Sequence, residues 1–141
     1  MQAQNIIFPA QILPGPGVFS QLGAICALLG TRALVIGGHQ SLAVVGDKIR
    51  HQLEGSAVEL AGSEWFGGES SERHISRLAK IVKDKKADIV IGVGGGKSLD
   101  TCKAVGAETN VPVVTIPTIA ATCAAVTPLT IRYHDDGHFR D

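Results

Sequence analysis

The chain has 141 residues, which is the size of one domain with a single hydrophobic core. Its 13 basic and 13 acidic residues cancel, and the clustered positive charge with which proteins bind nucleic acid or membrane surfaces is missing. No apolar stretch is long enough to span a membrane. We therefore expect a globular protein with a small-molecule partner, and neither nucleic acid nor membrane.

The predicted elements alternate between strands and helices along the chain. Continuous apolar runs, typical of buried parallel strands, occupy 33–36, 89–91 and 111–116, with weaker strands at 6–8 and 57–61. Apolar residues with helical spacing fill the gaps: Val18, Leu22, Ile25 and Leu29; Leu42, Val45, Ile49 and Leu53; Ile75, Leu78 and Val82; Leu99, Cys102 and Val105. The pattern predicts an α/β domain over residues 1–141, doubly wound around a mainly parallel sheet with Rossmann-like topology.

Glycines follow three of the strand-like segments. They are Gly37–Gly38, Gly67–Gly68 and Gly94–Gly96. In an open parallel sheet, ligands bind at the edge where strands end, and glycine lets a ligand approach the backbone closely. Gly67–Gly68 could equally form a simple turn.

The run of three glycines is the strongest functional signal. A buried strand leads into Gly94–Gly96, and a helix is expected to open at about Lys97, so that backbone N–H groups and the helix dipole converge on one anion site. A pyrophosphate suits such a site. A P-loop would need glycine where Ile91 stands, and the common dinucleotide fingerprint would need glycine at Lys97. A glycine-rich turn without a ligand is the alternative, at a high entropic cost.

Asp100 and Lys103 lie one helical turn apart just beyond these glycines. They could form a surface ion pair. Asp100 also faces the predicted anion site, where a hydroxyl group of the ligand is an alternative partner.

Three motifs together resemble a known family. The segments 94–103 (G-G-G-K-x-x-D-x-x-K), 113–120 and 66–69 are similar to the glycerol dehydrogenase branch of the iron-containing alcohol dehydrogenases, and closest to its hydroxycarboxylate dehydrogenases. The resemblance covers nearly the whole chain. It implies an N-terminal α/β domain that binds NAD or NADP, a helical C-terminal domain that holds a divalent metal (zinc or iron), and an active site between them.

The resemblance also implies particular cofactor contacts. The pyrophosphate and the adjoining ribose would be bound by Gly94, Gly95, Gly96, Lys97, Ser98 and Asp100. Gly38 would approach the adenine ribose, and Thr118 and Ala121 would lie under the cofactor. The nicotinamide side would be lined by Thr127, Leu129 and Tyr133.

Two positions depart from this branch. Glycerol dehydrogenases usually carry Asp where this chain has Gly38, and a carboxylate there binds the 2′-hydroxyl of NAD and repels a 2′-phosphate, so NADP becomes acceptable or even preferred. Cys123 replaces an Asp of the substrate pocket, which favours a 2-oxo or 2-hydroxy acid over glycerol; alternatively, Cys123 is a small buried apolar residue. No base pairs visibly with Cys123, so it is not expected to be a nucleophile. Hydride transfer needs no side chain from these residues, so we assign no catalytic residue.

The family's metal ligands, an Asp and two His, would lie beyond Asp141, so we expect no metal site and no helical domain within this chain. A strand at 127–133 and a turn at 134–137 predict a truncated hairpin. We expect the complete enzyme to be an oxidoreductase and the chain by itself to bind dinucleotide without catalysis. A relative that acts on a phosphorylated polyol is a further alternative.

The cysteines and the N-terminus bear on location and assembly. Three cysteines, without a C-x-x-C pair, argue against a disulfide framework, and no signal peptide is recognisable, so a cytoplasmic location is expected. Helix faces that a second domain would cover make a homo-oligomer possible.

Overall fold

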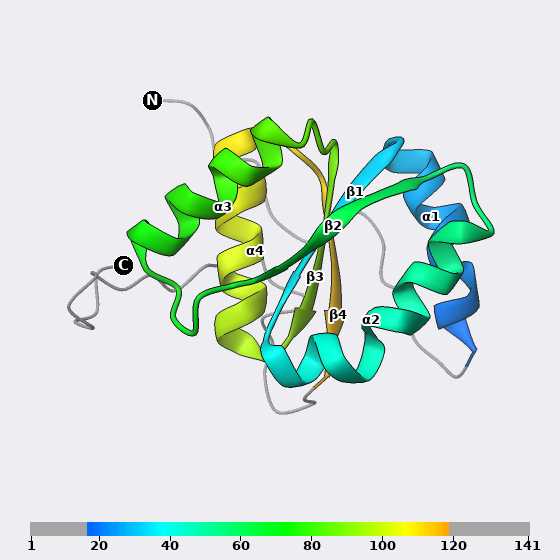
Figure 1. Ribbon diagram of the computed structural model, residues 1–141, viewed down its shortest axis with the longest axis horizontal. Helices are drawn as coiled ribbons and strands as arrows, with labels where there is room; N and C mark the ends of the chain where they lie inside the picture. Colours follow the sequence, from blue (N-terminus) through cyan, green and yellow to red (C-terminus); the bar gives the residue numbers. More distant parts are fainter. Residues whose placement is uncertain (1–16, 119–141) are drawn as a thin grey trace, which may run out of the picture.

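A four-stranded parallel sheet forms the centre of the computed structural model, which describes residues 17–118 (Figure 1). The strands are β1 (Arg32–Gly37), β2 (Glu59–Trp65), β3 (Ile89–Gly94) and β4 (Val113–Pro117). The helices are η1 (Val18–Gln21, a 3-10 turn), α1 (Leu22–Leu29), α2 (His39–Glu54), α3 (Glu72–Asp84) and α4 (Gly96–Thr109). The α/β prediction with a parallel sheet is confirmed.

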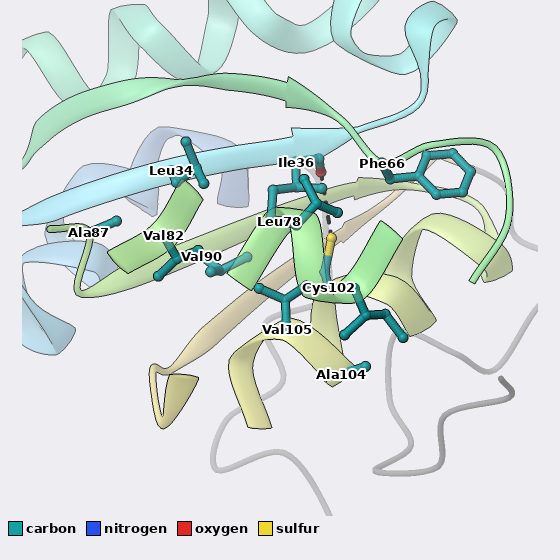
Figure 2. Packing of buried hydrophobic residues seen from close by; sticks show 11 residues of the cluster. Leu34, Ile36, Phe66, Leu78, Val82, Ala87, Val90, Cys102, Ala104 and Val105 are labelled. Carbon is teal, nitrogen blue, oxygen red and sulfur yellow. Dashed lines mark hydrogen bonds between the residues drawn. The ribbon is translucent and has the colours of Figure 1, made fainter. Parts of the chain in front are cut away.

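Helices cover both faces of the sheet (Figure 1). On one face, Leu34 and Ile36 of β1 pack with residues of α3 and α4; Figure 2 shows this cluster. On the other face, Ala33 and Val35 pack with residues of α1 and α2. Because successive residues of a strand point to opposite faces, a strand that is covered twice needs an unbroken apolar run, and β1 has one.

The strand order is β2-β1-β3-β4. From β1 the chain first crosses to β2 on one side and then returns to β3 on the other side. The reversal leaves the carboxyl ends of β1 and β3 next to each other at a topological switch point, where open α/β sheets bind their ligands. We therefore expect a ligand site at the loops that follow β1 and β3.

The predicted buried helix faces are largely confirmed. Ile75, Leu78 and Val82 are buried on α3, as are the predicted residues of α4. The predicted buried face of the first helix is wrong in part. Leu22 is buried as predicted, but Cys26, which was not on the predicted face, is also buried, and Leu29 is 43% exposed. Val18 lies in the 3-10 turn η1 and not in α1, and Leu29 is the last residue of α1.

The second strand was expected at 57–61, and the structure places β2 at Glu59–Trp65. The predicted strand at 6–8 and the predicted hairpin at 127–137 lie outside the described residues. Within residues 17–118, none of the helices has the length and apolar character needed to cross a bilayer.

A glycine near the end of α4 allows this helix to lie close to β4. A Cβ atom at Gly106 would collide with the side chain of Val113 and lie 2.9 Å from the carbonyl oxygen of Val111. Gly46 on α2 is the opposite case, because a Cβ atom there meets nothing within 4 Å.

These two glycines give a matched pair of stability predictions. Gly106→Ala should lower the free energy of unfolding by about 1–3 kcal/mol, because the backbone of α4 must move away from β4. Gly46→Ala should raise it by about 0.5–1 kcal/mol, because alanine favours the helix and fits without contact. Urea denaturation measures both. Destabilisation by Gly46→Ala, or a neutral Gly106→Ala, would contradict this packing.

A buried thiol joins α4 to the sheet. Cys102 is fully buried, and its S–H group donates a hydrogen bond to the carbonyl oxygen of Ile36 at 3.7 Å (Figure 2). Burial raises the pKa of this thiol from 9.0 to about 12. The folded protein therefore keeps the thiol proton at a pH where the unfolded chain has released it.

This pKa shift predicts a pH dependence of stability. Between pH 9 and pH 12 the unfolded chain binds fewer protons at Cys102 than the folded chain, so stability falls with rising pH, by at most about 1.4 kcal/mol per pH unit. The stability is fully present below pH 9. Cys102→Ala should show a flatter decline between pH 8 and pH 10.5, measured as unfolding free energy in urea. Identical slopes in the two proteins would refute the assignment.

Candidate functional site

Three loops meet at the carboxyl edge of the sheet. Gly37 pairs with Val93 where β1 and β3 end, and the backbone N–H of Thr118, after β4, donates to the carbonyl oxygen of Gly94 at 3.1 Å. The hydroxyl groups of Ser41, in the first turn of α2, and Thr118 lie 3.3 Å apart. The predicted contacts Gly38, Gly94 and Thr118 are thus brought together from three strands.

The glycine loop has the backbone geometry expected of an anion site. Gly94 adopts a φ of 135°, which side chains rarely tolerate, and a Cβ atom there would lie 3.1 Å from that of Ser98. The helix α4 then begins at Gly96, one residue earlier than predicted, with Gly95 as an N-cap that has no side chain. The first backbone N–H groups of the helix therefore have no capping side chain and can bind an anion.

Ser98 and Lys97 have different roles at the start of α4. The hydroxyl of Ser98 is buried and donates a hydrogen bond to the carbonyl oxygen of Val93 at 2.8 Å. This bond connects the first turn of α4 to the end of β3. A contact of Ser98 with phosphate through its backbone N–H stays a prediction. Lys97 is exposed, and its Nζ lies 2.9 Å from Oε2 of Glu69, in the segment between β2 and α3.

The ion pair of Asp100 and Lys103 is more buried than the surface pair that the sequence suggested. Their charged groups are 3.2 Å apart, and the side chains are only 12% and 13% exposed. A ligand hydroxyl as a further partner of Asp100 stays a prediction. Lys103 also borders a shallow hollow of about 440 Å³ that lies at the far end of α4, around Asn110 and Pro112, away from the glycine loop.

Gly38 has room for a side chain. Its φ of −76° and ψ of 159° suit any residue, and a Cβ atom would make ordinary contacts, 3.8 Å from a ring carbon of Phe66 and 3.9 Å from the hydroxyl of Ser41. The first turn of α2 carries no acidic residue. The absence of a carboxylate at Gly38 is therefore a chemical feature of the site and not a steric necessity.

Sequence reasoning missed an aromatic pair beside Gly38. The rings of His39 and Trp65 are stacked, with centroids 4.6 Å apart and planes 15° apart, and Trp65 is 41% exposed. Trp65 ends β2, and Phe66 and His74 lie against its other sides. A single tryptophan at the end of a strand was the available signal, but the stack with His39 depends on the pairing of β1 with β2.

The remaining predicted contacts cannot be placed. Ala121, Cys123, Thr127, Leu129 and Tyr133 lie outside residues 17–118. Gly67 and Gly68, the other glycine pair, both have positive φ values, as turn glycines do. In the described part of the chain, no three His, Cys, Asp or Glu side chains form a group that could hold a metal ion.

Comparison with known proteins identifies relatives of this chain. The family model for iron-containing alcohol dehydrogenases matches residues 9–140. A glycerol dehydrogenase from Citrobacter freundii is 36% identical over 133 residues, and hydroxycarboxylate dehydrogenase A from Escherichia coli is 38% identical over 135 residues. Each alignment covers 94% of this chain and 36% of the relative, so the chain spans about a third of the relatives' length.

A solved structure agrees with these matches. The iron-containing alcohol dehydrogenase of Thermotoga maritima superimposes with a TM-score of 0.83 and 26% identity, over 98% of this chain and 44% of that one. The resemblance inferred from the three motifs is thereby confirmed, together with the fold.

Proposed function

This chain belongs to the iron-containing alcohol dehydrogenase family, and we propose that it binds NAD(H) or NADP(H) for an oxidoreductase that transfers a hydride between the nicotinamide and an alcohol or carbonyl substrate. The convergence of the Gly38 and Gly94–Gly96 loops at the switch point carries the proposal. A dinucleotide has a pyrophosphate at its middle, and the start of α4 is suited to bind one.

The residues of this chain bind and orient the cofactor. The backbone N–H groups at the start of α4 and the ammonium group of Lys97 offset the two negative charges of the pyrophosphate. The adenosine half would extend toward Gly38 at the end of β1, and the nicotinamide half toward Thr118 at the end of β4. The bound nicotinamide supplies the hydride chemistry, and the residues of this chain hold the cofactor in position.

The same proposal includes a metal and a class of substrate. A divalent metal, as the name of the family implies, would polarise the substrate oxygen. The described residues offer no group of side chains to hold it. We propose a glycerol-like polyol or a 2-oxo or 2-hydroxy acid as substrate, because the relatives include a glycerol dehydrogenase and a hydroxycarboxylate dehydrogenase. Cys123 in place of an acidic residue favours the acid.

Titration with NADH and, separately, NADPH tests the proposal. Saturable binding of at least one of them is expected in calorimetry. Quenching of Trp65 should accompany it, because this is the chain's single tryptophan and lies beside the proposed adenosine site. Absence of binding by both dinucleotides would contradict the proposal.

Gly38→Asp tests the preference between the two dinucleotides. A Cβ atom at position 38 meets only ordinary contacts. The new carboxylate should repel a 2′-phosphate, so NADPH affinity should fall about tenfold or more while NADH affinity holds or rises. Gly46→Asp places the same charge at an open position within α2, the helix that follows Gly38, and should leave both affinities unchanged. Equal effects of Gly38→Asp on NADH and NADPH would show that position 38 does not meet the 2′ position.

A further inference from the structure

Two adjacent polar side chains between β2 and α3 have buried atoms without a hydrogen-bond partner among the described residues. They are Oε1 of Glu69 and Oγ of Ser70, and Ser70 is only 1% exposed. Roughly nine in ten buried polar groups in proteins have a partner, and an exception often marks a place where water or a ligand completes the site. The segment that carries them, Phe66–Gly67–Gly68–Glu69, is one of the motifs on which the family resemblance rested.

Glu69 lies at the glycine loop although it is distant in sequence. Its Oε2 is 2.9 Å from Nζ of Lys97, in the first turn of α4. A carboxylate can accept about four hydrogen bonds, and the contact with Lys97 is the one that the described residues provide. A third of the Glu69 side chain is exposed but Oε1 itself is buried, so a ligand hydroxyl would have to enter the space beside Oε1 to bond with it.

The strand order indicates which half of a dinucleotide would meet Glu69. The loop after β2 lies on the same side of β3 as Gly38, whereas Thr118 and β4 lie on the other side. The adenosine half of the dinucleotide is directed to the Gly38 side in the proposed binding mode. The groups it presents next to the pyrophosphate are the ribose hydroxyls, which are hydrogen-bond donors, and Gly38 has no side chain to accept from them.

We propose that Glu69 accepts hydrogen bonds from the ribose hydroxyls of the adenosine half, with the same carboxylate that positions Lys97. This inference rests on the proposed function. It places on the loop after β2 the ribose-binding carboxylate that the end of β1 lacks. Like an acid at position 38, this carboxylate would disfavour the 2′-phosphate of NADP(H). A purely structural role, in which Glu69 only holds Lys97 in place, is the competing account.

Three ligands separate the two accounts. ADP has both the pyrophosphate and the ribose hydroxyls, 2′,3′-dideoxy-ADP lacks the hydroxyls, and inorganic pyrophosphate lacks the nucleoside. Calorimetry of the full chain should show that loss of the hydroxyls weakens binding by about tenfold, the loss expected for a hydrogen bond to a charged group. In Glu69→Gln this penalty should shrink to about threefold or less, because the acceptor is no longer charged.

Pyrophosphate provides the second readout. It should bind Glu69→Gln at least as tightly as the unaltered chain, because the negative charge of Glu69 beside the loop is removed. Glu72→Gln is the matched control, since Glu72 is an exposed acid three residues further along, at the start of α3, and it should keep the full hydroxyl penalty. Glu69→Gln is nearly isosteric, and its circular dichroism and melting temperature verify that it folds.

The outcomes distinguish this inference from the proposed function. An equal hydroxyl penalty in the unaltered chain and Glu69→Gln overturns the inference. So does an equal weakening of ADP and pyrophosphate in Glu69→Gln, which means that Glu69 only positions Lys97. An unaltered chain that binds none of the three ligands overturns the proposed function, and the inference with it.

Discussion

The parallel pairing of β1 with β3 determines where the candidate site lies. Because Gly37 pairs with Val93, the loops that follow the two strands open at the same edge, although they are more than fifty residues apart in the chain. Because the strand order is β2-β1-β3-β4, the connection after β1 leads to a strand on one side and the connection after β3 leads to a strand on the other side. Open α/β sheets bind their ligands at such a switch point, and glycines, which let a ligand approach the backbone closely, follow both strands here.

The sequence predicted the fully buried strands β1 and β3 most closely, and it misplaced the ends of the partly buried strand β2. β1 and β3 are covered on both faces, so their apolar runs are unbroken. β2 is an edge strand with exposed positions such as Glu59 and Ser63, and its pattern is too weak to place its ends. Its pairing with β1 also shifts at a bulge between Ala33 and Leu34, which no local pattern reveals.

The backbone of the candidate site could be predicted from the sequence, whereas its side-chain contacts could not. Three consecutive glycines between a buried strand and a helix favour an anion site. The contact of Lys97 with Glu69 and the stack of His39 on Trp65 join residues from different βα units, so they require the strand order to be known. The Asp100–Lys103 pair was found by helical spacing, and its burial follows from the packing of α4 on the sheet.

The central claim is that an anion binds at the start of α4, and backbone amide chemical shifts measure this most directly. Inorganic pyrophosphate, titrated into the ¹⁵N-labelled chain, should move the amide resonances of Gly95, Gly96, Lys97 and Ser98 in a saturable way, with smaller changes at Gly38. The amides of Asn110 and Val111, beside the hollow at the other end of α4, should stay in place. Saturable shifts at that end with none at the glycine loop, or no saturable shift anywhere, would contradict the account.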